Sequence, residues 1–238
     1  MSISILHRHL IFVALTAATL AHAQVASDVR MRIQLPAQPG RSPAPHAVLW
    51  LKPLDETQVP PFLPEHHYTL LQKNRMFTPH LLVIPVGSIV DFPNADPFFH
   101  NVFSLFDGKR FDLGLYEAGT TKAVTFSREG ISFIFCNIHA EMSAVVIALA
   151  TPYYAISNAR GDVTIADVPP GRYQLQIFHA GVAPDALHAM TREITIAPGQ
   201  ANLGTFTLAE SDVTVEHKNK YGRDYDRPQP DSPAYARP

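Results

Sequence analysis

Proline and glycine interrupt this sequence so often that long helices have little room to form. The 238-residue chain contains 21 Pro and 12 Gly. Between them lie short runs rich in Val, Ile and Phe, such as those at 80–94, 131–136 and 143–150. No segment keeps a helical period over three turns, whereas many short strands bounded by turn residues are typical of sandwiches and barrels. We therefore predict an all-β fold.

The first residues have the pattern of an export signal. Arg8 lies in a weakly basic start, an apolar run covers residues 10–20, and Ala21-His22-Ala23 provides small residues where a signal peptidase cuts. We expect residues 1–23 to be a signal peptide, a mature chain that begins near Gln24, and a location in the periplasm. The alternative is an uncleaved membrane anchor, although the apolar run is shorter than the ~20 residues of a comfortable span.

The remaining chain is long enough for one large or two small domains. We expect a first sandwich at 24–152, with its densest β pattern at 76–150, and a smaller one at 153–210. Residues 211–238 are polar without apolar periodicity, which predicts a disordered tail. The pattern leaves open which sandwich residues 24–60 complete. The formal net charge of −2 does not indicate nucleic-acid binding.

The single cysteine of the chain, Cys136, lies in a spacing that indicates a metal site. His139 and Met142 follow it at intervals of three residues, and His100 begins an earlier β-rich run. Two His, one Cys and a weak axial Met are the ligands of a mononuclear blue-copper centre. Three alternatives remain: Cys136 is a buried apolar thiol, Met142 is a core residue and not a ligand, or the metal is zinc, which rarely takes a thioether.

Two segments resemble the cupredoxins, the blue-copper electron-transfer family. CNIHAEM at 136–142 matches the short ligand loop of amicyanin-like members, and HNVFS at 100–104 resembles the segment with the first copper His. The resemblance implies a Greek-key β-sandwich with one type 1 copper. Its ligands would be His100, Cys136, His139 and Met142. It also implies that Asn101 tethers the Cys loop by hydrogen bonding. The chain departs from many short-loop members at Ala140, where they have Pro.

The second unit resembles a carboxypeptidase regulatory-like, or transthyretin-like, β-sandwich module. The stretch GDVTIADVPPGRYQLQIFHAG at 161–181 carries this resemblance. Such modules are structural or bind partners, and they imply no catalysis. Together the two units resemble exported plastocyanin-like proteins that are associated with methylamine utilization.

The expected function is that of a periplasmic one-electron carrier rather than an enzyme. The resemblance implies that His139 is the electron port, with a redox protein docking over it. A copper enzyme needs further copper sites, usually with His-x-His motifs, and the one such motif, at 7–9, lies inside the expected signal. Two other functions stay open. One is partner binding by two sandwiches that do not use copper, and the other is copper delivery.

Overall fold

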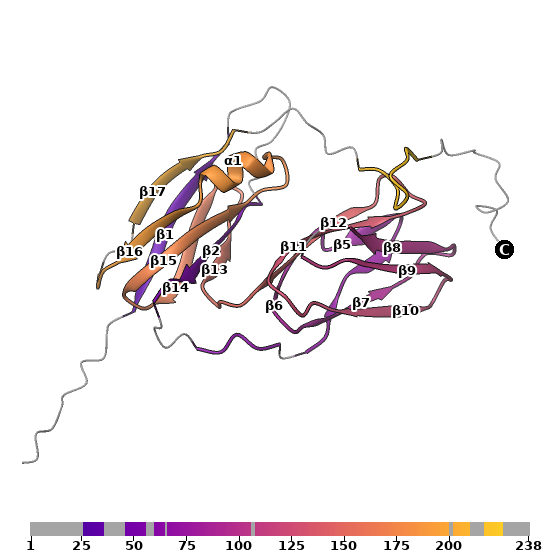
Figure 1. Ribbon diagram of the computed structural model, residues 1–238, viewed down its shortest axis with the longest axis horizontal. Coiled ribbons are helices and arrows are strands. Elements are labelled where there is room, and N and C mark those ends of the chain that lie inside the picture. The colour runs from indigo at the N-terminus through magenta and orange to yellow at the C-terminus, as the bar shows by residue number, and fades with distance from the viewer. Residues whose placement is uncertain are drawn as a thin grey trace, which may run out of the picture.

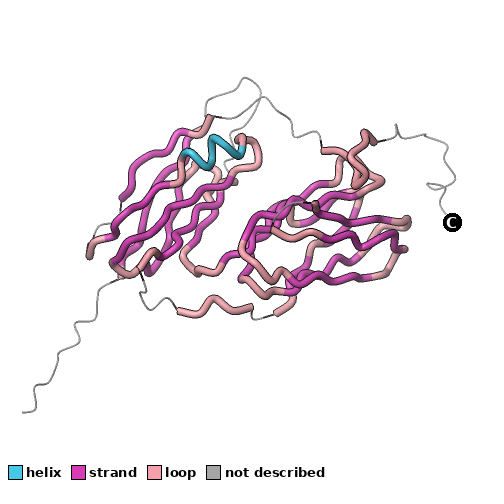
Figure 2. Tube along the Cα trace, viewed as in Figure 1, coloured by secondary structure: helices cyan, strands magenta, loops and turns pink. Residues whose placement is uncertain are grey.

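The structured part of the chain is almost entirely β. The computed structural model describes residues 26–35, 46–55, 60–64, 66–105, 108–199, 202–209 and 217–225. Over these residues the chain forms two β-rich bodies, with one short helix, α1 (Pro184–Ala189) (Figure 1, Figure 2). The predicted all-β sandwich class is therefore confirmed. The expected signal peptide, 1–23, lies outside the described residues. No described helix has the length and apolarity needed to cross a membrane.

The first body has one large and one small sheet. The large sheet has the strand order β6-β12-β11-β8-β9, the small sheet has the order β10-β7-β3, and β4 and β5 form a separate hairpin. These strands are β3 (Tyr68–Thr69), β4 (Leu71–Lys73), β5 (Met76–Thr78), β6 (Leu81–Pro85), β7 (Ile89–Pro93), β8 (His100–Ser104), β9 (Phe111–Tyr116), β10 (Thr121–Thr125), β11 (Gly130–Cys136) and β12 (Ser143–Leu149). Alternation along β11 turns Ile134 and Cys136 into the core between the sheets.

The second body also has two sheets, of three and four strands. Their orders are β14-β1-β17 and β13-β2-β15-β16. The strands are β1 (Ser27–Gln34), β2 (Val48–Pro53), β13 (Tyr154–Ile156), β14 (Asp162–Val168), β15 (Gly171–Phe178), β16 (Arg192–Ile196) and β17 (Asn202–Thr207). Buried and exposed residues alternate without interruption along β1, as expected of a strand with one face on a core.

The strand pairings give a different division of the chain from the expected one. β1 pairs with β14 and β17, and β2 pairs with β13 and β15. The described residues of 24–60 that form strands therefore belong to the second sandwich, not to a first domain at 24–152. Local patterns show that these segments are strands, but they do not encode a partner more than a hundred residues away. We propose that the first sandwich, from about residue 66 to 149, interrupts the second in chain order.

The two sandwiches share a hydrophobic boundary along β12. Val146 faces the core of the first sandwich, whereas its neighbours Val145 and Ile147 belong to the same cluster of buried residues as the core of the second. The rings of Phe133 and Phe178 also meet there, with their centroids 6.0 Å apart. β12 is thus buried on both faces, which explains why its sequence is continuously apolar instead of alternating.

Candidate metal centre

Two neighbouring strands and one loop bring three of the predicted ligands together. His100 is the first residue of β8 and Cys136 is the last residue of β11; these strands pair so that Cys136 lies opposite Val102. The chain then turns back, because the N–H of Cys136 donates to the Met142 carbonyl (3.3 Å) and the N–H of Met142 donates to the His139 carbonyl (3.1 Å). This tight turn places His139 beside the cysteine.

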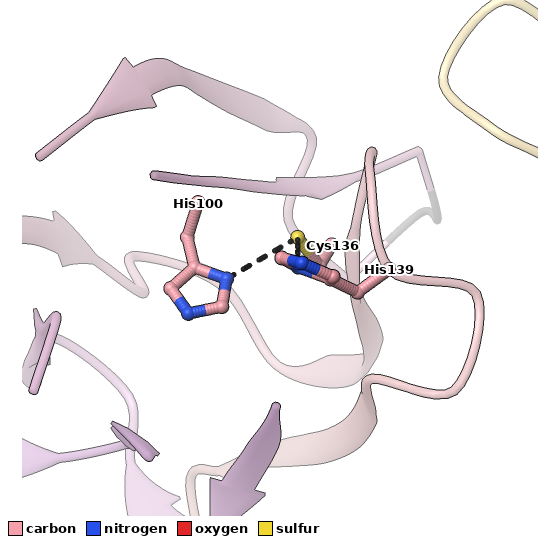
Figure 3. Close-up of side chains that lie close together, drawn as sticks. All are labelled: His100, Cys136 and His139. Atoms are coloured by element: carbon pink, nitrogen blue, oxygen red, sulfur yellow. Dashed lines mark hydrogen bonds between the residues drawn. The ribbon is translucent and has the colours of Figure 1, made fainter. Parts of the chain in front are cut away.

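The ligand atoms of these three side chains form a small, buried triangle (Figure 3). The Cys136 sulfur lies 3.6 Å from Nδ1 of His100 and 3.4 Å from Nδ1 of His139, and all three atoms lie within 4.8 Å of one another. Metal bonds to thiolate and imidazole ligands of about 2.0–2.3 Å put trigonal donors about 3.5–3.7 Å apart. The same distances suit weak sulfur hydrogen bonds, but the soft and borderline donor set fits copper.

The site is almost closed to water. His100 and Cys136 are fully buried and His139 is 4% exposed. Burial, together with the neighbouring His100, lowers the pKa of His139 to about 4, and burial also lowers the pKa of His100. Burial therefore favours the neutral form of both imidazoles, which is the form that binds a metal. Burial raises the pKa of the Cys136 thiol, although backbone N–H groups, including that of Asn101, favour the thiolate.

A buried carboxylate orients the first histidine. Nε2 of His100 lies 2.9 Å from Oδ2 of Asp96, a side chain that is 4% exposed. With Nε2 donating to the carboxylate, Nδ1 is left as an acceptor that faces the Cys136 sulfur, which is the arrangement that metal-binding histidines use. Asp96 in turn accepts the backbone N–H groups of Asn74 (2.6 Å) and Arg75 (3.0 Å). These hydrogen bonds keep its pKa low against the effect of burial.

An aromatic ring lies against both histidines, and a cation lies over that ring. The ring of Phe98 lies 5.3 Å from that of His100 and 5.4 Å from that of His139, and the Arg75 guanidinium lies 5.3 Å from the Phe98 centroid. Asn74 and Arg75 both have positive φ, and they form the two-residue turn of the β4–β5 hairpin. The hairpin thus supports the site twice, through Asp96 and through Phe98.

Met142 and Asn101, the other predicted site residues, lie close to this triangle. Met142 is fully buried in the same core cluster as Cys136. Asn101 does contact the cysteine loop, but through its main chain: its carbonyl accepts the N–H of Asn137 (2.9 Å). Its side chain instead donates to Asp112 (2.6 Å). The contact between Asn101 and the cysteine loop is therefore a backbone hydrogen bond.

Asp96 and Arg75 were not among the site residues predicted from the sequence. The signal for Asp96 was available, because it is the acidic residue four positions before His100. Nothing in the sequence showed that the N–H groups of a distant hairpin turn would meet this carboxylate. Residues 217–225, expected to be part of a disordered tail, were also missed. They instead form hydrogen bonds with the ligand loop, through the side chains of His217 and Tyr225 and the backbone N–H of Lys220.

Comparison with known proteins returned solved structures only. No protein-family model and no curated protein matches the sequence. Similar folds include a copper-containing nitrite reductase from Thermus scotoductus SA-01 (24% identity, 37% of this chain, 23% of that chain, TM-score 0.34). They also include a purple cupredoxin from Nitrosopumilus maritimus (23% identity, 34% of this chain, 99% of that chain, TM-score 0.32). A third is amicyanin from Paracoccus versutus (21% identity, 37% of this chain, 85% of that chain, TM-score 0.32).

Proposed function

We propose that the protein is a type 1 copper protein that carries single electrons between redox partners. The observation that carries this proposal is the buried triangle of His100, Cys136 and His139, whose ligand atoms face one another at distances that suit one metal ion. Met142, buried in the same core, is the proposed weak axial ligand. Bound copper supplies a couple between Cu(II) and Cu(I) at this position.

The protein's own residues would keep the geometry the same in both oxidation states. Asp96 fixes the tautomer and ring orientation of His100. Backbone hydrogen bonds hold the turn that carries His139 and Met142. Phe98 excludes water from the two imidazoles. Four protein ligands would leave no open position for a substrate, which favours electron transfer over turnover and supports a non-enzymatic role.

The test is a titration of the metal-free protein, from Gln24 to the C-terminus, with Cu(II), followed by visible absorption and electron paramagnetic resonance. We expect an intense thiolate-to-copper band and a narrow copper hyperfine splitting, both lost in Cys136→Ser. Zn(II) added in competition reports the preferred metal. A protein that stays colourless and binds Cu(II) weakly would contradict the proposal and favour a copper-independent binding role.

His67 provides a matched control for the histidine ligands. Like His100, it pairs with a carboxylate through one ring nitrogen, Nδ1 to Oδ2 of Asp91 at 3.1 Å, but it is exposed. We expect His100→Gln to abolish the thiolate band and His67→Gln to leave it intact. Equal loss in both variants would show that copper is bound elsewhere.

The docking partner and the cellular location belong to the same proposal. The exposed apolar residues Phe99 (53% exposed) and Ile138 (37%) flank the two ligand histidines in sequence, and we place the redox partner there, over His139. We also propose export to the periplasm after removal of residues 1–23, and a carboxypeptidase regulatory-like role for the second sandwich. The mass of the protein recovered from a periplasmic extract tests the first of these; a mass that includes residues 1–23 would contradict it.

A further inference from the structure

Residues 217–225, called the strap below, lie against the first sandwich although they follow the last strand of the second. In Figure 1 this is the yellow segment beside the first sandwich, between two grey traces. The strap contacts the sandwich next to the residues that carry the proposed copper ligands. Its contacts are hydrogen bonds and one ring stack rather than strand pairing, and they converge on the loop between Cys136 and Met142.

His217 fixes the strap at the loop and at the strand before it. Its Nε2 donates to the carbonyl of Ala140 (2.7 Å). Its ring stacks on Phe135, with centroids 3.9 Å apart and an angle of 21° between the planes. Phe135 points away from the first core, since Cys136 beside it points inward. The strap therefore holds the residue after His139 from the outer side of the sheet.

Tyr225 makes the second attachment, at the cysteine itself. Its hydroxyl lies 2.8 Å from the Cys136 carbonyl and 3.1 Å from Nδ1 of His217. Burial lowers the pKa of His217. A neutral His217 that donates through Nε2 has an acceptor at Nδ1, so the single phenolic proton serves two acceptors. His217 and Tyr225 are thus hydrogen-bonded to each other, and together they bind the backbone at both ends of the segment Cys136–Ala140.

Lys220 connects the strap to the segment that carries His100. Its backbone N–H donates to Oδ1 of Asn137 (2.9 Å), and its ammonium donates to Asp112 (2.7 Å). Asp112 also accepts the side-chain amide of Asn101, the residue after His100 (2.6 Å). One or two hydrogen bonds therefore connect the strap to the residues next to His100 and His139 and to the backbone of Cys136.

The loop itself needs such support. Ala140 has no ring that fixes φ, unlike a proline, so the turn after His139 keeps a rotatable backbone. We propose that the strap positions the ligand loop, with His217 and Tyr225 as the positioning residues that hold His139 and Met142 against Cys136. This inference rests on the proposed copper function. Positioning residues next to metal ligands typically change metal affinity by about 10–100-fold, and we expect a change in that range.

The test compares His217→Phe, which keeps a ring on Phe135 but removes the donor to Ala140, with Tyr225→Phe, which removes one hydroxyl. Tyr221→Phe is the matched control, because Tyr221 lies in the strap but is 71% exposed. All are made in the chain from Gln24 onward. The readouts are the hyperfine splitting and absorption of the Cu(II) form, the reduction potential, and the rate of copper removal by a chelator.

We expect both positioning variants to lose copper at least about 10-fold faster and to show an altered hyperfine splitting at unchanged apo-protein stability, while the control matches the wild type. Spectra and release rates equal to wild type would overturn the strap proposal and leave the copper function standing. If the wild type itself shows no thiolate band, hydrogen exchange of amides 137–142 decides. Faster exchange in the two variants supports loop positioning, and unchanged exchange refutes it.

Discussion

Asp96 places a negative charge in a site that is almost closed to water. The carboxylate meets three N–H donors, two from the β4–β5 turn and one from His100, and each of them favours its charged form. If copper binds as proposed, a charge in this position would stabilise Cu(II) over Cu(I) and so lower the reduction potential. Asp96 would therefore link the structure of a distant hairpin to the electronic properties of the proposed copper ion.

We predict that Asp96→Asn weakens Cu(II) binding about 10–100-fold and raises the reduction potential. The amide keeps the shape but removes the charge and presents N–H to groups that are already donors, which costs about 1–3 kcal/mol of stability. Competition titration, voltammetry and urea unfolding of the apo protein measure the three effects. The control is Asp91→Asn, whose partner His67 is exposed. Unchanged affinity and potential in Asp96→Asn would count against the orienting role.

The apo protein should lose stability as the pH falls from about 6.5 to about 4. Burial first, and His100 second, lower the pKa of His139 to about 4, whereas the unfolded chain protonates near 6.5. Between these values the unfolded state binds a proton that the folded state does not. The loss is complete at about pH 4 and amounts to about 3 kcal/mol for this group. Urea unfolding across this range should show a shallower pH dependence in His139→Gln, and equal slopes would contradict the assignment.

The sequence predicted three side chains that the structure brings together, but not the groups around them. Cys136 and His139 could be singled out because copper chemistry requires rare residue types and these two are three residues apart, and His100 because it begins a β-rich run. The strap could not, because the attachments of His217 and Tyr225 are single side-chain contacts to backbone carbonyls. Apolar periodicity, the main signal in a sequence, does not record such contacts. A polar composition therefore predicted disorder where the structure has a docked segment.

At the scale of elements, β1 depends on a close approach of two backbones. The N–H of Ile33 donates to the carbonyl of Gly161 (2.7 Å), and Gly161 has a φ of +81°. A Cβ added at Gly161 would lie 1.9 Å from the Ile33 carbonyl oxygen. The requirement for glycine is therefore both conformational and steric. It fixes the end of the β1–β14 pair, on which the second sandwich is built.

We predict that Gly161→Ala is much more destabilising than Gly204→Ala. Gly204 has nearly the same φ, +79°, but a Cβ there would meet nothing within 4 Å. The conformational cost alone is about 1–2 kcal/mol and applies to both variants. The clash with a backbone oxygen adds at least about 2 kcal/mol at Gly161. Urea unfolding of the two variants gives the difference directly, and equal losses would show that the backbone relaxes freely there.

β12 shows why the strands were easier to predict than their arrangement. Its apolar run identified a strand correctly, but such a run does not say which bodies cover its two faces. Similarly, β1 and β2 lie before the first sandwich in sequence, whereas the strands that pair with them lie after it. Which strands pair across such a long sequence separation depends on tertiary packing, not on the local composition of each strand.

At the scale of the whole molecule, the shared boundary along β12 should make the two sandwiches unfold together. Ile147 is fully buried and belongs to the core of the second sandwich, although its strand is part of the first. We predict that the wild-type apo protein shows one calorimetric transition. Ile147→Ala should cost about 2–5 kcal/mol and separate that transition into two, because it removes contacts between the bodies.

Val146→Ala provides the control for this prediction. Val146 is equally buried and adjacent, but it faces the first core. We expect this variant to lower the unfolding temperature without separating the transitions. Two resolved transitions in the wild type, or identical profiles for the two variants, would show that the sandwiches are not coupled through β12.

Because the first sandwich interrupts the second in chain order, paired strands of the second sandwich are synthesised at widely separated times. Arg32 and its partner Asp162 are 130 residues apart, so at ~5–20 residues per second about 6–26 s of synthesis separate them. During this interval β1 has no partner strand, which leaves an edge open to wrong pairings. The strands of the first sandwich all emerge within the same interval. The strap, at 217–225, is made only afterwards, so the ligand loop gains its last attachments after the strands of both sandwiches have been made.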